Sequence, residues 1–298
     1  MTKFTNSADF YQNTCICEKK VVILQAKFFD MEKTKLEVVR QIAKGGQKVV
    51  YLAAKKDNPS EQVIIKEASI TSAASLQRIM REVSFLSSID SPYFPKNLGS
   101  SFDLKTMTIT IIEEFVEGST LRNCMQNYSD WPSIQVLLNQ LIDGLSSVWS
   151  RHVVHRDLKP ENIIIKTNGT PCIIDFGIAR FLDMDSITNT LQQMGPCTPL
   201  YASPEQLRND KTAIDLRTDF YALGIIALEL YLQQHPFHPD IVGGGMLYDN
   251  LLQGKYALSS ATRKEDDHLK ILANNLLQVQ PYMRPRTIEQ LRNLINNI

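Results

Sequence analysis

The sequence predicts an α+β fold, with strands in the first part of the chain and helices in the rest. Short runs of β-branched residues recur between residues 36 and 112 and are bounded by glycine and polar residues, which is typical of strands. From residue 133 onward, leucine, isoleucine and valine recur with the spacing of amphipathic helices. A chain of 298 residues with 43% hydrophobic residues can bury the core that such a fold requires.

Composition excludes several classes of partner. Acidic and basic residues balance at 32 each, so no net field attracts nucleic acid or an anionic membrane. The five cysteines are odd in number and show no paired spacing, which favours a reducing compartment. The longest apolar runs, such as residues 21–24 and 224–232, are too short to span a bilayer, and the polar start does not resemble a secretory signal. We therefore expect a cytoplasmic protein without a membrane span or a nucleic-acid partner.

The first 35 residues form an N-terminal extension without an interpretable motif. Residues 20–25 are rich in β-branched side chains and predict a strand. We expect this segment to pack on the domain, because residues 21–24 together with Phe28 and Phe29 would otherwise expose a sizeable apolar patch.

A strand, a loop and a second strand follow. Residues 36–42 and 49–53 have strand patterns, and the loop between them contains Gly45. Most loops of this kind only turn the chain. Further strand patterns occupy residues 63–66 and 108–112, and an apolar helical repeat over residues 76–86 lies between them.

The remainder of the chain is predicted to be mainly helical. Residues 133–152 carry an apolar repeat that continues to the start of a polar loop. Residues 220–231 form a long apolar helix, and residues 288–298 form an amphipathic one.

The polar loop and a second short motif carry the candidate chemistry. The loop reads His-Arg-Asp-Leu-Lys-Pro-Glu-Asn over residues 155–162, and Asp-Phe-Gly follows at residues 175–177. The apolar run at residues 163–165 predicts a short strand that returns the chain toward the second motif, so both lie at one mouth. All these residue types are also common in turns, but the order and spacing of the two motifs disfavour a plain surface loop.

The residue types at this mouth suit phosphoryl chemistry. Asn162 and Asp175 offer the hard oxygen atoms that Mg²⁺ accepts when it is also bound to phosphates. Asp157 can accept a proton from an attacking hydroxyl, and Lys159 can neutralise charge on the transferred group.

Together these motifs resemble the catalytic loop and metal-binding triplet of eukaryotic-type (Hanks-type) protein kinases. The loop resembles the serine/threonine-directed members, and residues 201–206 resemble bacterial ones. The resemblance covers about residues 36–298. It implies a two-lobed fold, with a small antiparallel sheet and one key helix, a larger helical lobe, and ATP between them. The implied boundaries are about residues 36–113 for the N-lobe, 114–118 for the hinge and 119–298 for the C-lobe.

The resemblance also assigns roles to individual residues. Asp157 and Lys159 are the implied catalytic residues, and Asn162 and Asp175 hold Mg²⁺, with Mn²⁺ as the other candidate metal. Lys66 is implied to hold the α- and β-phosphates of ATP through an ion pair with a glutamate on the following helix. The residues implied to surround the nucleotide are Ile42, Gly45, Val50, Lys66, Glu82, Glu114, Val116 and Ile164.

Four positions depart from the family pattern. Ala43 and Lys48 replace two of the three glycines in the phosphate-covering loop, so fewer backbone N–H groups can approach phosphate without a Cβ in the way. Either Lys48 compensates by supplying charge, or the loop is weakened. Ile64 replaces an alanine above the adenine. Glu113 occupies the gatekeeper position at the back of the adenine pocket, unless the register slips by one residue and puts Ile112 there.

The segment after Gly177 resembles an activation segment that ends at residues 202–205. Arg156 could bind a phosphate group on this segment through charge-assisted hydrogen bonds and so order it. By resemblance, Thr198 faces the substrate near Asp157. The candidate phosphorylation sites are Ser186, Thr188 and Thr190.

Four further residues have implied structural roles. His155 is expected to be a packed core residue rather than a ligand or base, and Asp219 to anchor the catalytic loop from below. Glu205 and Arg284 are expected to form a buried ion pair, whose disruption from one side costs about 3 to 5 kcal/mol.

Three functions follow as hypotheses. The first is an ATP- and Mg²⁺-dependent serine/threonine protein kinase that also phosphorylates its own activation segment. The second is a nucleotide-binding scaffold without useful catalysis, suggested by the altered glycine loop, Ile64 and Glu113. The third is a small-molecule kinase, which residues 202–205 and Arg284 oppose because they resemble a platform for protein substrates.

Overall fold

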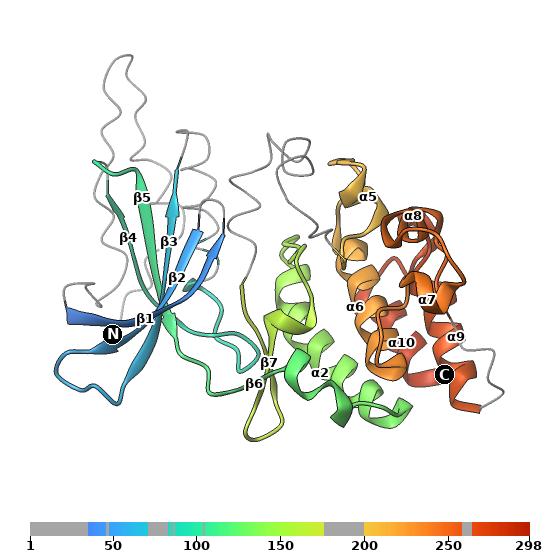
Figure 1. The fold of residues 1–298 in the computed structure, drawn as a ribbon, viewed down its shortest axis with the longest axis horizontal. Helices are drawn as coiled ribbons and strands as arrows, with labels where there is room; N and C mark the ends of the chain where they lie inside the picture. The colour runs from blue at the N-terminus through green and yellow to red at the C-terminus, as the bar shows by residue number, and fades with distance from the viewer. Residues whose placement is uncertain are drawn as a thin grey trace, which may run out of the picture.

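The computed structural model has two parts, a β-sheet lobe and a helical lobe, joined in the middle of the chain (Figure 1). This arrangement agrees with the α+β, two-lobed fold predicted from the sequence. The residues that the structure describes are 35–45, 48–70, 83, 85, 87–103, 105–175, 200–257 and 264–298.

The N-lobe is built on an antiparallel five-stranded sheet in the order β1-β2-β3-β5-β4. All four strands predicted in this region are present. The additional strand, β4, was not predicted, because its sequence contains glycine and serine and lacks a β-branched run. The strands are β1 (Leu36–Gly45), β2 (Lys48–Lys55), β3 (Gln62–Ser69), β4 (Asn97–Asp103) and β5 (Thr108–Glu114).

The two faces of this sheet carry different side chains. Successive residues of a strand point to opposite faces, so Ile65 and Ile112 share one apolar cluster while Ile111 belongs to a second cluster on the other face. Lys66 lies opposite Ile111 in the β3–β5 ladder, and Glu113 follows two residues later on the same face. Glu113, and not Ile112, therefore shares a face with Lys66.

A second, three-stranded sheet lies between the two lobes (Figure 1). Gly118 begins its first strand, and a Cβ at this position would lie 2.3 Å from the carbonyl oxygen of Ile165. Only glycine allows the strand that leaves the N-lobe to approach its neighbour so closely. The strands are β6 (Gly118–Thr120), β7 (Ile163–Lys166) and β8 (Pro171–Ile173), and the turn after β6 is η3 (Leu121–Asn127).

The C-lobe is organised around helix α6 (Leu216–Leu232). Every residue from Thr218 to Leu230 is buried, so the helix is covered on all sides by other elements. Helix α2 (Trp131–Trp149) packs against it and begins at Asp130, whose side chain accepts a hydrogen bond from the Ser133 N–H. The shorter elements are η4 (Pro160–Asn162), α5 (Pro204–Leu207), α7 (Pro239–Val242), α8 (Leu247–Gln253), α9 (Lys264–Leu276), η5 (Pro281–Met283) and α10 (Ile288–Asn297).

The segment that leads into β4 is fixed to the C-lobe. The N–H of Ile173 on β8 donates to the carbonyl oxygen of Tyr93 at 2.8 Å, and Lys166 Nζ donates to the Pro92 carbonyl oxygen at 2.7 Å. Gly144 on α2 leaves room for the Tyr93 side chain, since a Cβ there would lie 2.6 Å from the Tyr93 Cβ. The N-lobe therefore contacts the C-lobe at a second place besides the chain connection at Gly118.

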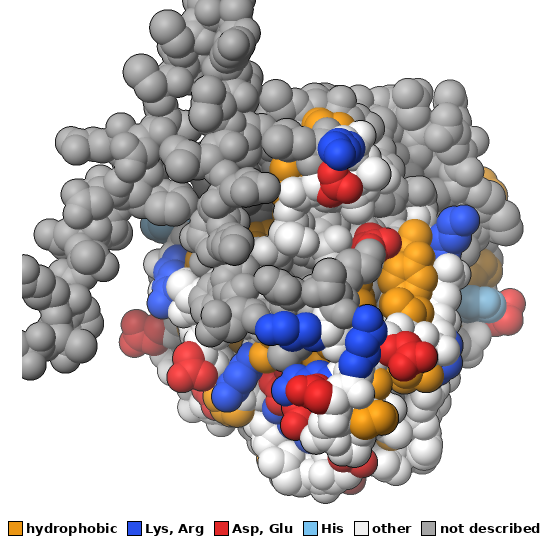
Figure 2. Space-filling view, turned by 90° about the vertical axis from the view of Figure 1, so that its left-hand side faces the viewer, with side chains coloured by type: hydrophobic (Ala, Val, Ile, Leu, Met, Phe, Trp, Pro, Cys, Tyr) orange, Lys and Arg blue, Asp and Glu red, His pale blue; other side chains and the backbone are white. Residues whose placement is uncertain are grey.

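The surface at the sheet end of the molecule is mixed in character. On the coloured part of this face, Figure 2 shows basic and acidic side chains interspersed with hydrophobic ones. Strand β1 contributes three exposed apolar side chains, those of Val38, Val39 and Ile42. Across the part of the chain that the structure describes, no helix is long and apolar enough to cross a membrane.

Candidate active site

The catalytic-loop residues predicted from the sequence converge on Asp157. Lys159 Nζ lies 3.0 Å from Asp157 Oδ2, and Asn162 Nδ2 donates to the same oxygen at 3.0 Å. Asn162 Nδ2 also donates to the Asp157 carbonyl oxygen at 2.8 Å, so the loop is closed on itself. About a fifth of the Asp157 side chain is exposed, and a substrate group can reach it.

Asp219 on α6 holds the start of this loop. It is fully buried and accepts hydrogen bonds from the backbone N–H groups of His155 and Arg156, both at 2.8 Å, and from Trp149 Nε1 at 2.8 Å. Arg156 has a positive φ of 66°, an unusual conformation for a non-glycine residue, and the bond to Asp219 fixes it. Both Asp219 and His155 occupy the structural positions predicted for them, and burial lowers the pKa of the His155 imidazole.

Asp175 lies next to this loop through the backbone. The N–H of Ile174 donates to the carbonyl oxygen of Asn162 at 2.8 Å, which brings the two predicted metal ligands together. Burial alone would raise the pKa of the Asp175 carboxyl, but the Lys66 and Lys48 ammonium groups outweigh it and lower that pKa to about 2. Asp175 is therefore a carboxylate at any physiological pH.

Two lysines from the N-lobe sheet reach the Asp175 carboxylate. Lys66 Nζ lies 3.8 Å from Asp175 Oδ1, and Lys48 Nζ forms an ion pair and hydrogen bond with the same oxygen. Lys66 Nζ also lies 2.5 Å from Glu113 Oε2. Positive and negative groups alternate in a row in which the side chains of Lys66, Glu113 and Lys48 are 9%, 10% and 12% exposed and that of Asp175 is 32% exposed.

The charges in this row support one another. Burial would lower the pKa of Lys66, but the carboxylates of Glu113 and Asp175 outweigh it and raise that pKa, so Lys66 is protonated. For Lys48, burial and the nearby Lys66 charge outweigh the attraction of Asp175 and lower the pKa. The surroundings thus favour the charged form of Lys66 and disfavour that of Lys48.

Sequence reasoning missed the contacts that Lys48 and Glu113 make. It expected Glu82 as the partner of Lys66, and Glu82 lies outside the described residues. Residues 111 and 113 lie on the same face of one strand, and Lys66 lies on the neighbouring strand. This alternation was the only signal in the sequence for a contact between Glu113 and Lys66. For Lys48, the signal was a lysine in place of a loop glycine.

The oxygen donors of this site fit a Mg²⁺ ion. Asn162 uses its Nδ2 on Asp157, which leaves the amide oxygen as its metal-ligating atom, and Asp175 contributes a carboxylate. Within the described ranges, no group of three or more His, Cys, Asp and Glu side chains could hold a metal by itself. One or two protein oxygens are what Mg²⁺ takes when phosphates and water complete its coordination.

The other residues implied to surround the nucleotide come from both lobes. They lie on β1 (Ile42 and Gly45), β2 (Val50), the end of β5 (Glu114), the connector (Val116) and β7 (Ile164). The Glu114 N–H already donates to the Lys96 carbonyl oxygen at 2.9 Å. Beyond the described residues lie Phe176, Gly177 and the activation-segment candidates Ser186, Thr188, Thr190 and Thr198.

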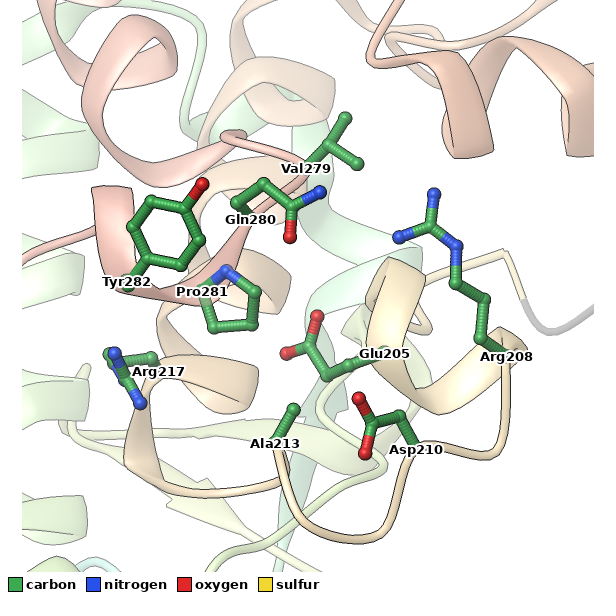
Figure 3. Close-up of a pocket in the computed structure, with 9 residues that line it drawn as sticks. All are labelled: Glu205, Arg208, Asp210, Ala213, Arg217, Val279, Gln280, Pro281 and Tyr282. Atoms are coloured by element: carbon green, nitrogen blue, oxygen red, sulfur yellow. The ribbon is translucent and has the colours of Figure 1, made fainter.

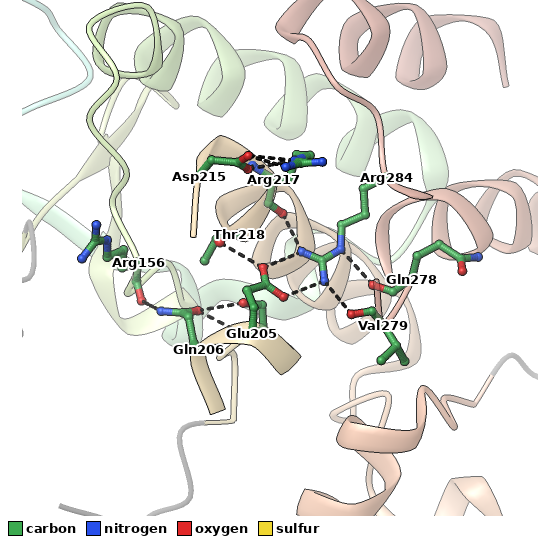
Figure 4. Close-up of polar contacts among 10 residues, drawn as sticks. Arg156, Glu205, Gln206, Asp215, Arg217, Thr218, Gln278, Val279 and Arg284 are labelled. Atoms are coloured by element: carbon green, nitrogen blue, oxygen red, sulfur yellow. Dashed lines mark hydrogen bonds and ion pairs between the residues drawn. The ribbon is translucent and has the colours of Figure 1, made fainter. Parts of the chain in front are cut away.

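Glu205 and Arg284 form a buried ion pair, as predicted. Arg284 donates from Nη1 and Nη2 to the two carboxylate oxygens of Glu205, at 2.7 and 2.9 Å (Figure 4). Thr218 adds a third hydrogen bond to Glu205 at 2.9 Å. Gln206, the next residue on α5, donates to the Arg156 carbonyl oxygen at 2.9 Å, which links this pair to the catalytic loop.

A second network, which the sequence did not indicate, surrounds Arg122 on η3. Its guanidinium contacts Glu161 Oε1 at 2.7 Å and Glu229 Oε1 at 2.8 Å, and it donates to the Tyr201 hydroxyl, which in turn donates to Glu229. The network joins the catalytic loop to α6 and to the residues before α5. Its members are far apart in the sequence, so no local pattern reveals it.

A cavity of about 250 Å³ opens beside the buried pair, between α5 and η5 (Figure 3). Its walls include Glu205, Arg217 and Tyr282. None of the side chains that converge on Asp157 or Asp175 lines it, so this cavity is separate from the candidate active site.

Comparison with known proteins gives the family. The protein kinase domain family matches residues 36–294. The probable serine/threonine-protein kinase CPE1738 of Clostridium perfringens is 30% identical over 210 residues, which is 68% of this chain and 30% of that protein. The serine/threonine-protein kinase PrkC of Bacillus subtilis is 32% identical over 207 residues, 67% of this chain and 31% of that protein.

A third relative, the serine/threonine-protein kinase PknL of Mycobacterium tuberculosis, is 36% identical over 132 residues, 44% of this chain and 32% of that protein. The chain thus matches less than a third of the length of these curated relatives. Domains of this kind use ATP, a divalent metal ion and protein substrates. With its two-lobed fold, its converging loop residues and these matches, the chain belongs to the protein kinase domain family.

Proposed function

We propose that this protein transfers the γ-phosphoryl group of ATP to serine or threonine hydroxyls of proteins. The observation that supports this most is the convergence of Lys159 and Asn162 on the Asp157 carboxylate, with Asp175 attached to the same loop through the Ile174 N–H. Bound Mg²⁺ would neutralise charge on the phosphates. We propose Asn162 and Asp175 as its ligands.

Asp157 acts on the attacking hydroxyl. Lys159 and Asn162 donate to one of its oxygens and so fix the orientation of its carboxylate. The substrate oxygen forms a bond to the γ-phosphorus, the bond from that phosphorus to the β–γ bridging oxygen breaks, and the hydroxyl proton passes to Asp157. Lys159 carries a positive charge within reach of the transferred group and offsets its negative charge.

The N-lobe holds the nucleotide. Lys66 binds the α- and β-phosphates, with Glu82 as its partner on the helix, and Lys48 adds a second ammonium group where the loop lacks glycines. Glu114 and Val116 contact the adenine edge through their backbone, and Ile42, Gly45, Val50 and Ile164 line the pocket. The N-lobe, hinge and C-lobe span about residues 36–113, 114–118 and 119–298.

Regulation by autophosphorylation belongs to the same proposal. Arg156 directly precedes the catalytic aspartate, where a guanidinium can bind a phosphate group bidentately. Phosphate on Ser186, Thr188 or Thr190 would then order the segment against the loop. By resemblance, we propose Thr198 as the residue that faces the substrate near Asp157.

Radiolabel transfer from ATP to a generic basic protein and to the chain itself tests the proposal. Asp157→Asn and Asp175→Ala should each lower the rate by about 10²-fold or more, because each removes a group that acts in the transition state. Asp143→Asn should retain the wild-type rate, because it alters only an exposed ion pair between Asp143 on α2 and Arg292 on α10. Parallel reactions with Mg²⁺ and Mn²⁺ identify the preferred metal.

Two results would decide against this function. Transfer at the wild-type rate by both Asp157→Asn and Asp175→Ala would exclude the assigned roles. Thermal stabilisation by Mg-ATP without any phosphate incorporation would instead favour the nucleotide-binding scaffold. The ion pair between Lys48 and Asp175 favours this alternative, because it engages an oxygen of a proposed metal ligand.

A further inference from the structure

Glu113 is an unusual residue for its position. It lies near the end of β5, a strand flanked on both sides by β3 and β4, and its side chain is only 10% exposed. A carboxylate in such a place needs a compensating charge, because burial without one is costly. Lys66 Nζ, 2.5 Å away, supplies that charge.

The geometry of the sheet sets this contact. Lys66 and Ile111 are directly opposite in the β3–β5 ladder, and Glu113 is the next residue of β5 on the same face. Diagonal neighbours of this kind are about 7 to 8 Å apart at the backbone, a distance that two long side chains bridge. Both members of the pair belong to paired strands of one sheet, and contacts built on strands are held more accurately than contacts built on loops.

The contact also leaves Lys66 able to bind phosphate. An ammonium group has three N–H donors. Glu113 Oε2 lies 2.5 Å from the Lys66 nitrogen and Asp175 Oδ1 lies 3.8 Å from it, so the contact with Glu113 engages only part of this donor capacity. Glu113 therefore holds the lysine through one of its three donors and leaves the others for further acceptors.

We propose that Glu113 is a positioning residue, which anchors Lys66 from the sheet so that its ammonium group stays at the phosphate site without depending on the helix predicted to carry Glu82. The inference rests on the proposed function insofar as Lys66 binds the phosphates of ATP. It differs from a role in shaping the adenine pocket, because a residue that acts through Lys66 affects phosphates and leaves the nucleoside alone.

The affinities of the full chain for Mg-ATP and for adenosine, measured by competition against a fluorescent nucleotide, separate these roles. Glu113→Gln should weaken Mg-ATP binding by about tenfold or more and change adenosine binding by less than about threefold. Lys66→Met should weaken Mg-ATP binding too, and adding Glu113→Gln to it should cause no further loss. Glu67 follows Lys66 on β3 and points to the opposite face of the sheet, so Glu67→Gln should leave both affinities unchanged.

Equal losses for Mg-ATP and adenosine, or a full effect of Glu113→Gln in the Lys66→Met background, would overturn the inference. If Glu113→Gln does not fold, Glu113→Asp keeps the charge but withdraws the carboxylate, and the same difference between Mg-ATP and adenosine is expected. Because the readout is binding, a chain that binds ATP but transfers no phosphate would refute the proposed function alone. An active chain whose Glu113→Gln variant binds Mg-ATP normally would refute only this inference.

Discussion

Replacing Glu205 by glutamine tests how far the buried ion pair stabilises the C-lobe. Glutamine has the same shape but no charge, so Arg284, which is fully buried, would keep its positive charge without a carboxylate partner. Removing one partner of a buried pair costs about 3 to 5 kcal/mol. Since domains are stable by only about 5 to 15 kcal/mol, this change would consume a large part of the free energy of unfolding.

Urea denaturation followed by tryptophan fluorescence measures the effect. With a denaturant slope of about 3 kcal/mol/M, Glu205→Gln should lower the midpoint by at least about 1 M. Asp215→Asn is the matched control, because it weakens the nearby ion pair between Asp215 and Arg217, whose side chains are 40% and 22% exposed, respectively. The asparagine keeps a side-chain acceptor for the N-terminus of α6. An exposed pair contributes about 0 to 1 kcal/mol, so the control should shift the midpoint little.

The effect also has a predicted pH dependence. Burial would raise the pKa of the Glu205 carboxyl, but the hydrogen bonds and charge of Arg284 outweigh it and lower that pKa. A carboxyl whose pKa is lower in the folded state stabilises the fold above its unfolded value of about 4.3, and this contribution disappears as the pH falls through the folded value. The difference between wild type and Glu205→Gln should therefore be full at neutral pH and shrink in acid. A cost below 1 kcal/mol at pH 7, equal to that of the control, would refute the reasoning.

Two further changes probe the candidate active site. Lys48→Met should weaken Mg-ATP binding by about tenfold, because it removes one of the two ammonium groups at Asp175, and Lys48→Arg should restore most of the affinity. Isothermal titration measures both affinities. An unchanged affinity of the Lys48→Met variant would exclude a contact between Lys48 and phosphate. Asp219→Asn should lower the free energy of unfolding by about 1 to 3 kcal/mol, because the N–H groups of His155 and Arg156 lose a charged acceptor. It should also lower kcat more than it raises the KM for ATP. Denaturation and steady-state kinetics that both match wild type would contradict this prediction.

The sequence predicted the elements whose pattern is local. Strands β1, β2, β3 and β5 contain runs of β-branched residues, helices α2 and α10 have an apolar repeat, and α6 is a long apolar stretch. Each of these elements is present within a few residues of its predicted bounds. Strand β4 was missed because its residues have low strand propensity, and it is a strand only because β5 pairs with it.

The candidate site divides in the same way. Asp157, Lys159 and Asn162 lie within six residues of each other, so their convergence followed from the motif alone. The ion pair between Lys66 and Glu113 depends on the register of two strands that are distant in the chain, and no single-sequence pattern fixes that register.

The contact between Tyr93 and Ile173 restricts how the two lobes can move. The N-lobe is attached to the C-lobe by the chain at Gly118 and again where the Ile173 N–H binds the Tyr93 carbonyl oxygen. Attachment at a second place resists twisting and sliding of one lobe on the other more than the chain connection alone would, and the ion pairs of Lys48 and Lys66 with Asp175 add to it. The hydrogen bond between Ile173 and Tyr93 therefore limits the directions in which the lysines of the sheet can shift relative to Asp175.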